Sequence, residues 1–215
     1  MKIRLSDHFT VKRLLRFTLP SIVMMIFTSI YGVVDGIFVS NFVGKTPFAA
    51  VNFIFLAVFF GYSQGMAPVV SYHFGAENTG ELKSLLKKSL VLIAIASVSM
   101  FLLAEALGPA FSSVFVGYDI ELFNLTKRAF AIYSISFLFS GLAIFGSGFF
   151  TALNDGVTSA IVSFLRTLVF QIGAVLLLPL IFGLDGIWLS IVAAELIAAV
   201  IVSIFLIVKR KKFRY

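Results

Sequence analysis

The stretch IWLSIVAAELIAAVIVSIFLIV, residues 187–208, decides the fold class, because its 22 residues include a single ionisable side chain, Glu195. A helix of about 20 mostly apolar residues crosses the roughly 30 Å of hydrocarbon in a bilayer. Five similar runs precede it, each bounded by charged or turn-forming residues. The six expected spans cover residues 17–40, 50–72, 90–116, 129–151, 159–182 and 187–208. We therefore predict an all-α membrane protein, a single bundle of six transmembrane helices over 1–215, with 209–215 as a basic cytoplasmic tail.

The composition supports this class and excludes several others. Hydrophobic residues make up 60% of the chain and charged residues only 13%, whereas soluble domains carry about 45–50% and about 25%. With 26 Phe and one Trp, the chain does not fit a soluble nucleic-acid binder despite its net charge of +7. The absence of cysteine excludes thiolate metal sites and cysteine nucleophiles. We expect no catalytic residues, no metal site and no cofactor, so the protein is not expected to be an enzyme.

Basic residues are distributed unequally over alternate loops. The N-terminal segment, the loop around 83–88 and the tail hold 13 of the 17 Lys and Arg residues, and the opposite side holds Lys45, Lys127 and Arg128. Because cytoplasmic loops are enriched in Lys and Arg, both termini are expected to be cytoplasmic in a multi-pass protein of the plasma membrane. The segment 75–88 is amphipathic, with Leu82, Leu85 and Leu86 on one face, and is expected to lie along the cytoplasmic interface.

The first span contains a polar stripe that ends in a carboxylate. Thr28 and Tyr31 precede Asp35 by seven and four residues, so all three share one helical face, together with Ser21. A charge placed in hydrocarbon costs about 2.5–3.5 kcal/mol and needs a reason to be there. We interpret Asp35, with Tyr31 and Thr28, as a candidate ion-coupling site for H⁺ or Na⁺. The alternative is a carboxylate hydrated near the outer interface.

Two further charges lie inside expected spans. Glu195 is eight residues into the sixth span, and Arg166 is seven residues from the start of the fifth. Consecutive helices are usually adjacent, so the two long side chains are predicted to form an intramembrane ion pair. The pair is either structural or part of a proton relay, and Arg166 alone could instead reach the cytoplasmic surface. Glu105 is expected at an interface, and Gln64 and Gln171 are expected to form interhelical hydrogen bonds.

Several gapped motifs, taken in order, resemble one transporter family. They are RFTLPSIVMMIFTSIYGVVDGIFVSNFVG from Arg16, AAVNFIF, GYSQGMAPVVSYHFGAEN, GFFTALNDG, SFLRTLVFQ, LLLPLIFGLDGIWLS and AAEL. Over about 11–206 the chain resembles the bacterial branch of the multidrug and toxic compound extrusion (MATE) transporters. Members of that family have twelve spans in two lobes, with the substrate cleft between the lobes.

The resemblance has two parts. The first span and the start of the second are similar to the family's first lobe, whereas the chain from about Gly61 onward is similar to the second lobe. The chain thus resembles a shortened member with an internal deletion, and one lobe of a MATE-type transporter. Asp35 matches the acidic residue on the first helix of that family, which is associated with proton or sodium coupling.

The resemblance implies a secondary transporter, or a subunit of one, that exports organic cations or drugs in exchange for H⁺ or Na⁺. Because alternating access requires two bundles around a central site, a six-span chain is expected to form a homodimer or to pair with another lobe. Its other partners would be the lipid bilayer and a small amphiphilic or cationic substrate, with no nucleic acid. One alternative is a truncated family remnant or membrane interaction partner that does not transport. A further alternative is a lipid-linked sugar flippase of the same superfamily.

Overall fold

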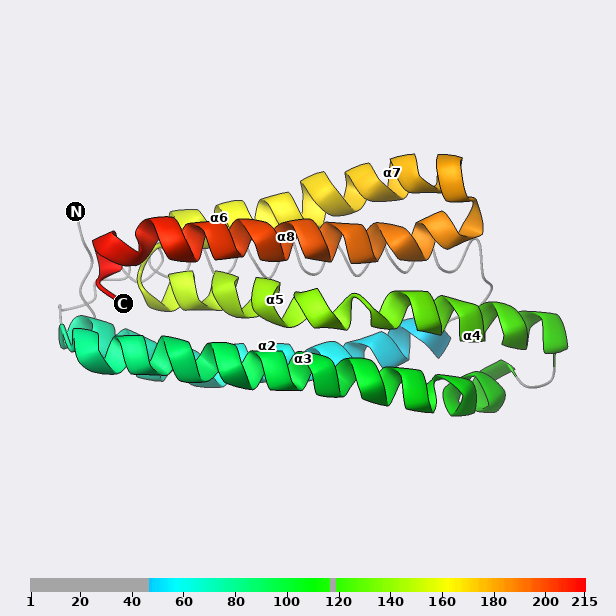
Figure 1. Cartoon of the computed structure of the whole chain (residues 1–215), viewed down its shortest axis with the longest axis horizontal. Coiled ribbons are helices and arrows are strands. Elements are labelled where there is room, and N and C mark those ends of the chain that lie inside the picture. Colours follow the sequence, from blue (N-terminus) through cyan, green and yellow to red (C-terminus); the bar gives the residue numbers. More distant parts are fainter. Residues whose placement is uncertain (1–46, 117–118) are drawn as a thin grey trace, which may run out of the picture.

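The computed structural model describes residues 47–116 and 119–215. The first expected span, with Thr28, Tyr31 and Asp35, lies outside the described residues. The helices of the described part are α2 (Pro47–Gly75), α3 (Thr79–Val116), α4 (Ile120–Ser134), α5 (Phe137–Ala152), α6 (Gly156–Phe164), the π-helical segment η1 (Leu165–Phe170), α7 (Gln171–Phe182) and α8 (Leu184–Phe213). The described residues form no strand, so the expectation of an all-α bundle is confirmed (Figure 1).

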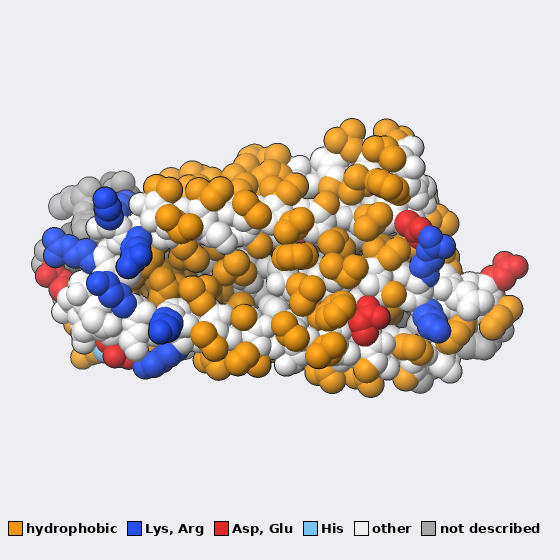
Figure 2. Space-filling model, in the orientation of Figure 1, with side chains coloured by type: hydrophobic (Ala, Val, Ile, Leu, Met, Phe, Trp, Pro, Cys, Tyr) orange, Lys and Arg blue, Asp and Glu red, His pale blue; other side chains and the backbone are white. Residues whose placement is uncertain are grey.

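Three helical stretches of the described chain are long and apolar enough to cross a membrane, namely 79–113, 156–182 and 184–213. A fourth crossing is possible by length and composition if α4 and α5, which meet at a bend of 49°, count as one broken span. Figure 2 shows hydrophobic side chains over the length of the bundle and Lys and Arg gathered at its ends. This distribution is expected of a bundle in a bilayer, because placing charged groups in the hydrocarbon costs free energy.

Helix α5 lies at the centre of the bundle. It packs against α2, α3, α6 and α8, and most of its side chains are buried. Two glycines make this possible: a Cβ at Gly146 would overlap Val202 of α8, and a Cβ at Gly148 would overlap Ser63 of α2. Small residues let helix backbones approach closely, which drives association where the surrounding lipid is as apolar as the side chains.

The segment expected along the interface has a different position. Residues 79–88 are the first turns of α3, which continues to Val116 without interruption. Leu82 is buried in the bundle core, whereas Lys83, Lys87 and Lys88 are exposed. The prediction of a separate interfacial segment is therefore wrong, because the apolar face of these residues packs against protein rather than lipid.

The end of the chain also packs against the bundle. Residues 209–213, expected to form part of a tail, continue α8 to Phe213. Arg214 then adopts a left-handed conformation with φ 58°, and the Tyr215 hydroxyl donates to the Leu206 carbonyl at 3.1 Å. The Tyr215 ring contacts Phe149 edge-on. Burial, together with the nearby Asp155 carboxylate, raises the pKa of Tyr215 above its usual range.

Candidate functional site

Arg166 of η1 and Glu195 of α8 form an ion pair inside the bundle. Arg166 Nη2 donates to Glu195 Oε1 at 2.6 Å, and Nε donates to Oε1 and Oε2, each at 3.0 Å. The two side chains are only 14% and 6% exposed. The structure thus brings together the two residues that the sequence pairs. Charge-assisted bonds of this kind hold two elements in a fixed orientation.

Arg166 lies in an irregular part of its helix. From Leu165 to Phe170 the backbone is π-helical, and the N–H of Gln171 donates to the carbonyl of Arg166, five residues earlier. π-Helical turns interrupt α-helices frequently at functional sites. They also rotate the side chains that follow, so the hydrophobic period of the sequence does not reveal how the side chains of α7 are placed relative to those of α6.

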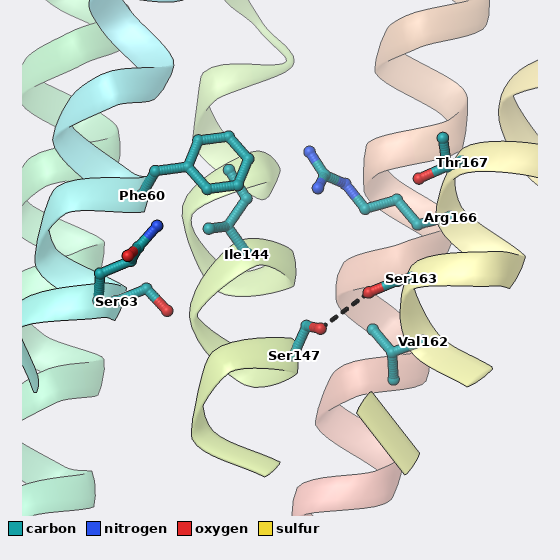
Figure 3. Close-up of a pocket in the computed structure, with 9 residues that line it drawn as sticks. Phe60, Ser63, Ile144, Ser147, Val162, Ser163, Arg166 and Thr167 are labelled. Atoms are coloured by element: carbon teal, nitrogen blue, oxygen red, sulfur yellow. Dashed lines mark hydrogen bonds between the residues drawn. The ribbon is translucent and has the colours of Figure 1, made fainter. Parts of the chain in front are cut away.

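A small cavity lies beside the ion pair, between α2, α5, α6 and η1. Its volume is about 30 Å³, which is room for about two water molecules. Figure 3 shows the guanidinium group of Arg166 pointing into this space toward Phe60 and Ile144. The residues that line it are Phe60, Ser63, Gln64, Ile144, Ser147, Val162, Ser163, Arg166 and Thr167.

Four hydroxyl groups join α5 to α6 beside the cavity, and two of them, those of Ser147 and Ser163, belong to residues that line it. Ser147 Oγ lies 2.9 Å from the Oγ atoms of both Ser159 and Ser163, and the Thr151 hydroxyl donates to Ser159 Oγ at 2.7 Å. The residues are four apart on each helix, so their side chains share one face and meet across the interface. Buried hydroxyls that bond to one another in this way avoid the cost of an unsatisfied polar group.

A second ion pair joins the turn between α5 and α6 to the end of α8. Lys209 Nζ lies 2.6 Å from Asp155 Oδ2, and the Thr158 hydroxyl donates to the same oxygen at 2.7 Å. Burial raises the pKa of the Asp155 carboxyl, but the hydrogen bonds from Lys209 and Thr158 outweigh that effect, so the pKa lies below its ordinary value of 3.8. Asp155 therefore stays ionised at neutral pH and anchors the end of α8.

The remaining candidates are dispersed. Glu105 of α3 is exposed and accepts a hydrogen bond from the Ser134 hydroxyl of α4. Gln171 is buried, and Gln64 lines the cavity. Within the described part of the chain, no group of three or more His, Asp or Glu residues is arranged to hold a metal ion. The hydroxyl cluster and the cavity are the features that sequence reasoning missed, since Ser and Thr are common in apolar helices.

Comparison with known families identifies the architecture. The family model MatE matches residues 20–177, well over half of the chain. This chain belongs to the MatE family. The match includes η1 with Arg166 and the whole of α5 and α6, and every residue named above as lining the cavity lies within it.

Individual relatives are distant and about twice as long. The multidrug export protein MepA of Staphylococcus aureus is 22% identical over 205 residues, which cover 93% of this chain and 45% of MepA. MepA of Staphylococcus haemolyticus is 23% identical over 195 residues, with coverages of 88% and 42%. The chain thus spans about half the length of the curated relatives it matches.

Solved structures show the same relation. A MOP superfamily transporter from Pyrococcus furiosus aligns with a TM-score of 0.85 and 18% identity, covering 99% of this chain and 50% of that one. The MATE transporter VcmN of Vibrio cholerae aligns with a TM-score of 0.78 and 14% identity, with coverages of 90% and 45%. The fold is therefore that of half a MATE transporter.

Proposed function

We propose that this chain acts as one lobe of a secondary active transporter that exports organic cations or drugs in exchange for H⁺ or Na⁺. The observation that carries the proposal is the family match over residues 20–177 combined with a fold that covers half of solved MATE transporters. The two relatives described above, both named MepA, are multidrug export proteins. No cofactor is part of the proposal beyond the coupling ion.

The small cavity supports a paired assembly. The cavity beside Arg166 has room for about two water molecules, which is too little for a drug-sized compound. Alternating access uses a site between two bundles, so the substrate would bind between this lobe and a second one. We propose a homodimer, or pairing with another lobe, as the active form.

The charge distribution supports a plasma-membrane protein with cytoplasmic termini. The rings of Phe74 and Phe213 are in contact, so the turn before α3 and the end of α8 lie at the same end of the bundle. Basic side chains gather there, among them Arg210, Lys211 and Lys212. Figure 2 shows this end as the more basic one, and the positive-inside rule assigns it to the cytoplasm.

Ethidium efflux from a host that lacks its own drug pumps tests the proposal. The wild-type chain should accelerate efflux, and Asp35→Asn should abolish the gain at equal membrane abundance, because the candidate coupling carboxylate is lost. Asp119→Asn is the matched control: Asp119 caps α4 through the backbone N–H groups of Glu121 and Leu122, and Asn caps helices equally well. Efflux equal to that of cells without the chain would overturn the proposal and favour a non-transporting remnant. Movement of lipid-linked sugars instead would favour a flippase.

A further inference from the structure

We infer that the basic end of the bundle is a binding site for an anionic phospholipid of the leaflet at that end. The headgroup lies on lysines and arginines of α3 and α8, and an acyl chain lies in the hollow between these two helices. The inference goes beyond the proposed function, because it assigns a lipid ligand to a surface that the export of a compound does not require.

Two helices supply the positive charge of this end. α3 begins there and α8 finishes there, and the rings of Phe74 and Phe213, with centroids 5.8 Å apart, connect the turn before α3 to the last turn of α8. Clusters of about four to eight Lys and Arg immediately beside a membrane helix attract anionic lipid headgroups. The exposed basic side chains are Lys83, Lys87 and Lys88 of α3 and Arg210, Lys211, Lys212 and Arg214 at the end of α8.

The carboxylates of this end neutralise little of that charge. Asp155 is engaged by Lys209 at 2.6 Å, and Glu81 lies 3.6 Å from Lys88. Glu77, in the turn between α2 and α3, is the third acidic residue described there. Among the described residues, no carboxylate pairs with the other exposed lysines and arginines of this end. The end therefore carries a net positive charge that an anionic partner can neutralise.

A hollow lined by hydrophobic side chains begins beside these basic residues. α3 and α8 both pack against α5 but make little contact with each other, so the surface between them is recessed over α5. Figure 2 shows this hollow toward the left, below α8 and above α3, with Lys and Arg gathered at its left end. The positive charge and the apolar recess are thus continuous on one face of the bundle.

The hollow belongs to the half of the bundle that carries the basic residues. Toward the other end α4 packs against α8, and Arg128 of α4 pairs with Asp185 of α8, so the two layers meet there. The 16 residues of α5 rise about 24 Å, which is enough to accompany an acyl chain through half of a hydrocarbon core of about 30 Å. An acyl chain can therefore lie along α5 while its headgroup stays at the basic end.

Charge and shape together select an anionic lipid over other ligands. A soluble anion would neutralise the lysines and arginines but leave the hydrophobic side chains of the hollow uncovered. A lipid without net charge would cover those side chains but leave the basic residues without a counter-charge. Because burial of apolar surface and attraction to basic residues both favour binding, a ligand that combines the two should bind best. Phosphatidylglycerol has this combination.

Native mass spectrometry of the full chain in a neutral detergent tests the inference. Dioleoylphosphatidylglycerol and dioleoylphosphatidylcholine are titrated separately. Wild type should retain a single phosphatidylglycerol per chain and bind it about tenfold or more tightly than phosphatidylcholine, because only the former carries net charge. Lys83→Gln with Lys87→Gln, and separately Lys211→Gln with Lys212→Gln, should each weaken phosphatidylglycerol binding about threefold to tenfold. All four side chains are exposed, so the fold is retained.

The matched control removes the same charge at the opposite end of the bundle. Lys127→Gln with Arg128→Gln acts on two exposed residues of α4 and should bind phosphatidylglycerol as wild type does. Glycerol phosphate, which has the anion without the acyl chains, should not displace the bound lipid.

Four results would each overturn the inference. They are equal affinity for the two lipids, equal weakening by the control pair, binding of many phosphatidylglycerol molecules without saturation, and displacement by glycerol phosphate. The last result would show that the basic residues hold a free anion rather than a lipid. None of these measurements needs an exported compound, so their failure is separate from failure of the proposed function.

Discussion

The guanidinium of Arg166 donates hydrogen bonds to the carboxylate of Glu195, with Nη2 2.6 Å from Oε1 and Nε 3.0 Å from both oxygens. The pair joins the π-helical segment η1 to α8 across a contact that is almost closed to solvent. Because removing water from two charges is costly, the pair contributes little net stability, but breaking it is expensive.

Glu195→Ala should destabilise the protein by about 3–5 kcal/mol, because it leaves the Arg166 charge buried without its carboxylate. Replacing both residues, Arg166→Met with Glu195→Leu, should return the stability to near that of wild type. Unfolding in mixed micelles, followed by circular dichroism, measures both. A double variant as unstable as Glu195→Ala would show that the two side chains do not act as a pair.

Ser147→Ala should cost about 1–3 kcal/mol, because the hydroxyls of Ser159 and Ser163 each lose a buried partner. The matched control is Ser140→Ala on the same helix. Its hydroxyl donates to the Ser136 carbonyl, which still accepts the backbone N–H of residue 140, so this change should cost less than about 1 kcal/mol. The same unfolding measurement compares them, and equal costs would contradict the role of the hydroxyl cluster in joining α5 to α6.

Gly146→Ala should destabilise the bundle by about 1–3 kcal/mol, because the added methyl group overlaps Val202 where α5 and α8 meet. Adding Val202→Ala should recover part of that loss by making room. Gly173→Ala in α7 is the control: no atom of the described residues lies within 4 Å of its added Cβ, and Ala favours a helix over Gly by about 1 kcal/mol. The two glycine variants should therefore shift the melting temperature in opposite directions. A fall of the same size in both would contradict close packing at Gly146.

Stability should depend on the Asp155 carboxyl in acid. Its pKa is lowered in the folded protein, so its contribution is complete above the unfolded value of about 3.8 and is lost as the pH falls through the folded pKa. Wild type should be more stable than Asp155→Asn at neutral pH, and the difference should shrink below pH 3.8. Melting temperatures across this range measure the effect. A difference that is constant with pH would show that the Lys209 ion pair contributes nothing.

Much of the fold could be predicted from the sequence, because long apolar runs have few alternatives in a membrane. The helix around Glu195 is predicted by the length of its run alone. Arg166 and Glu195 could be paired because each charge is expensive alone and their helices are consecutive. Burying either charge without a partner would cost free energy, so each residue needed an oppositely charged neighbour. The consecutive helices placed the two residues close enough to be that neighbour for each other.

Other features depend on tertiary packing. The bend at Ile135–Ser136 between α4 and α5 falls inside one continuous apolar run without proline, so no local signal marks it. The π-helical turn at Arg166 has the sequence LRTLVF, which contains no residue that marks such a turn. The amphipathic pattern around Leu82 fits a lipid interface and a protein core equally well, and only the packing against the bundle decides between them. Asp35 lies outside the described residues, and its coupling role stays a prediction.

The central claim is that this chain is one lobe of a transporter and works only when paired. Drug transport driven by an imposed ion gradient should be measured in proteoliposomes while the protein-to-lipid ratio is lowered until most vesicles hold a single chain. The account predicts that transport per chain falls toward zero as the chains are diluted, and that covalent linkage of two copies in tandem restores it. Transport per chain that stays constant down to one chain per vesicle would contradict it.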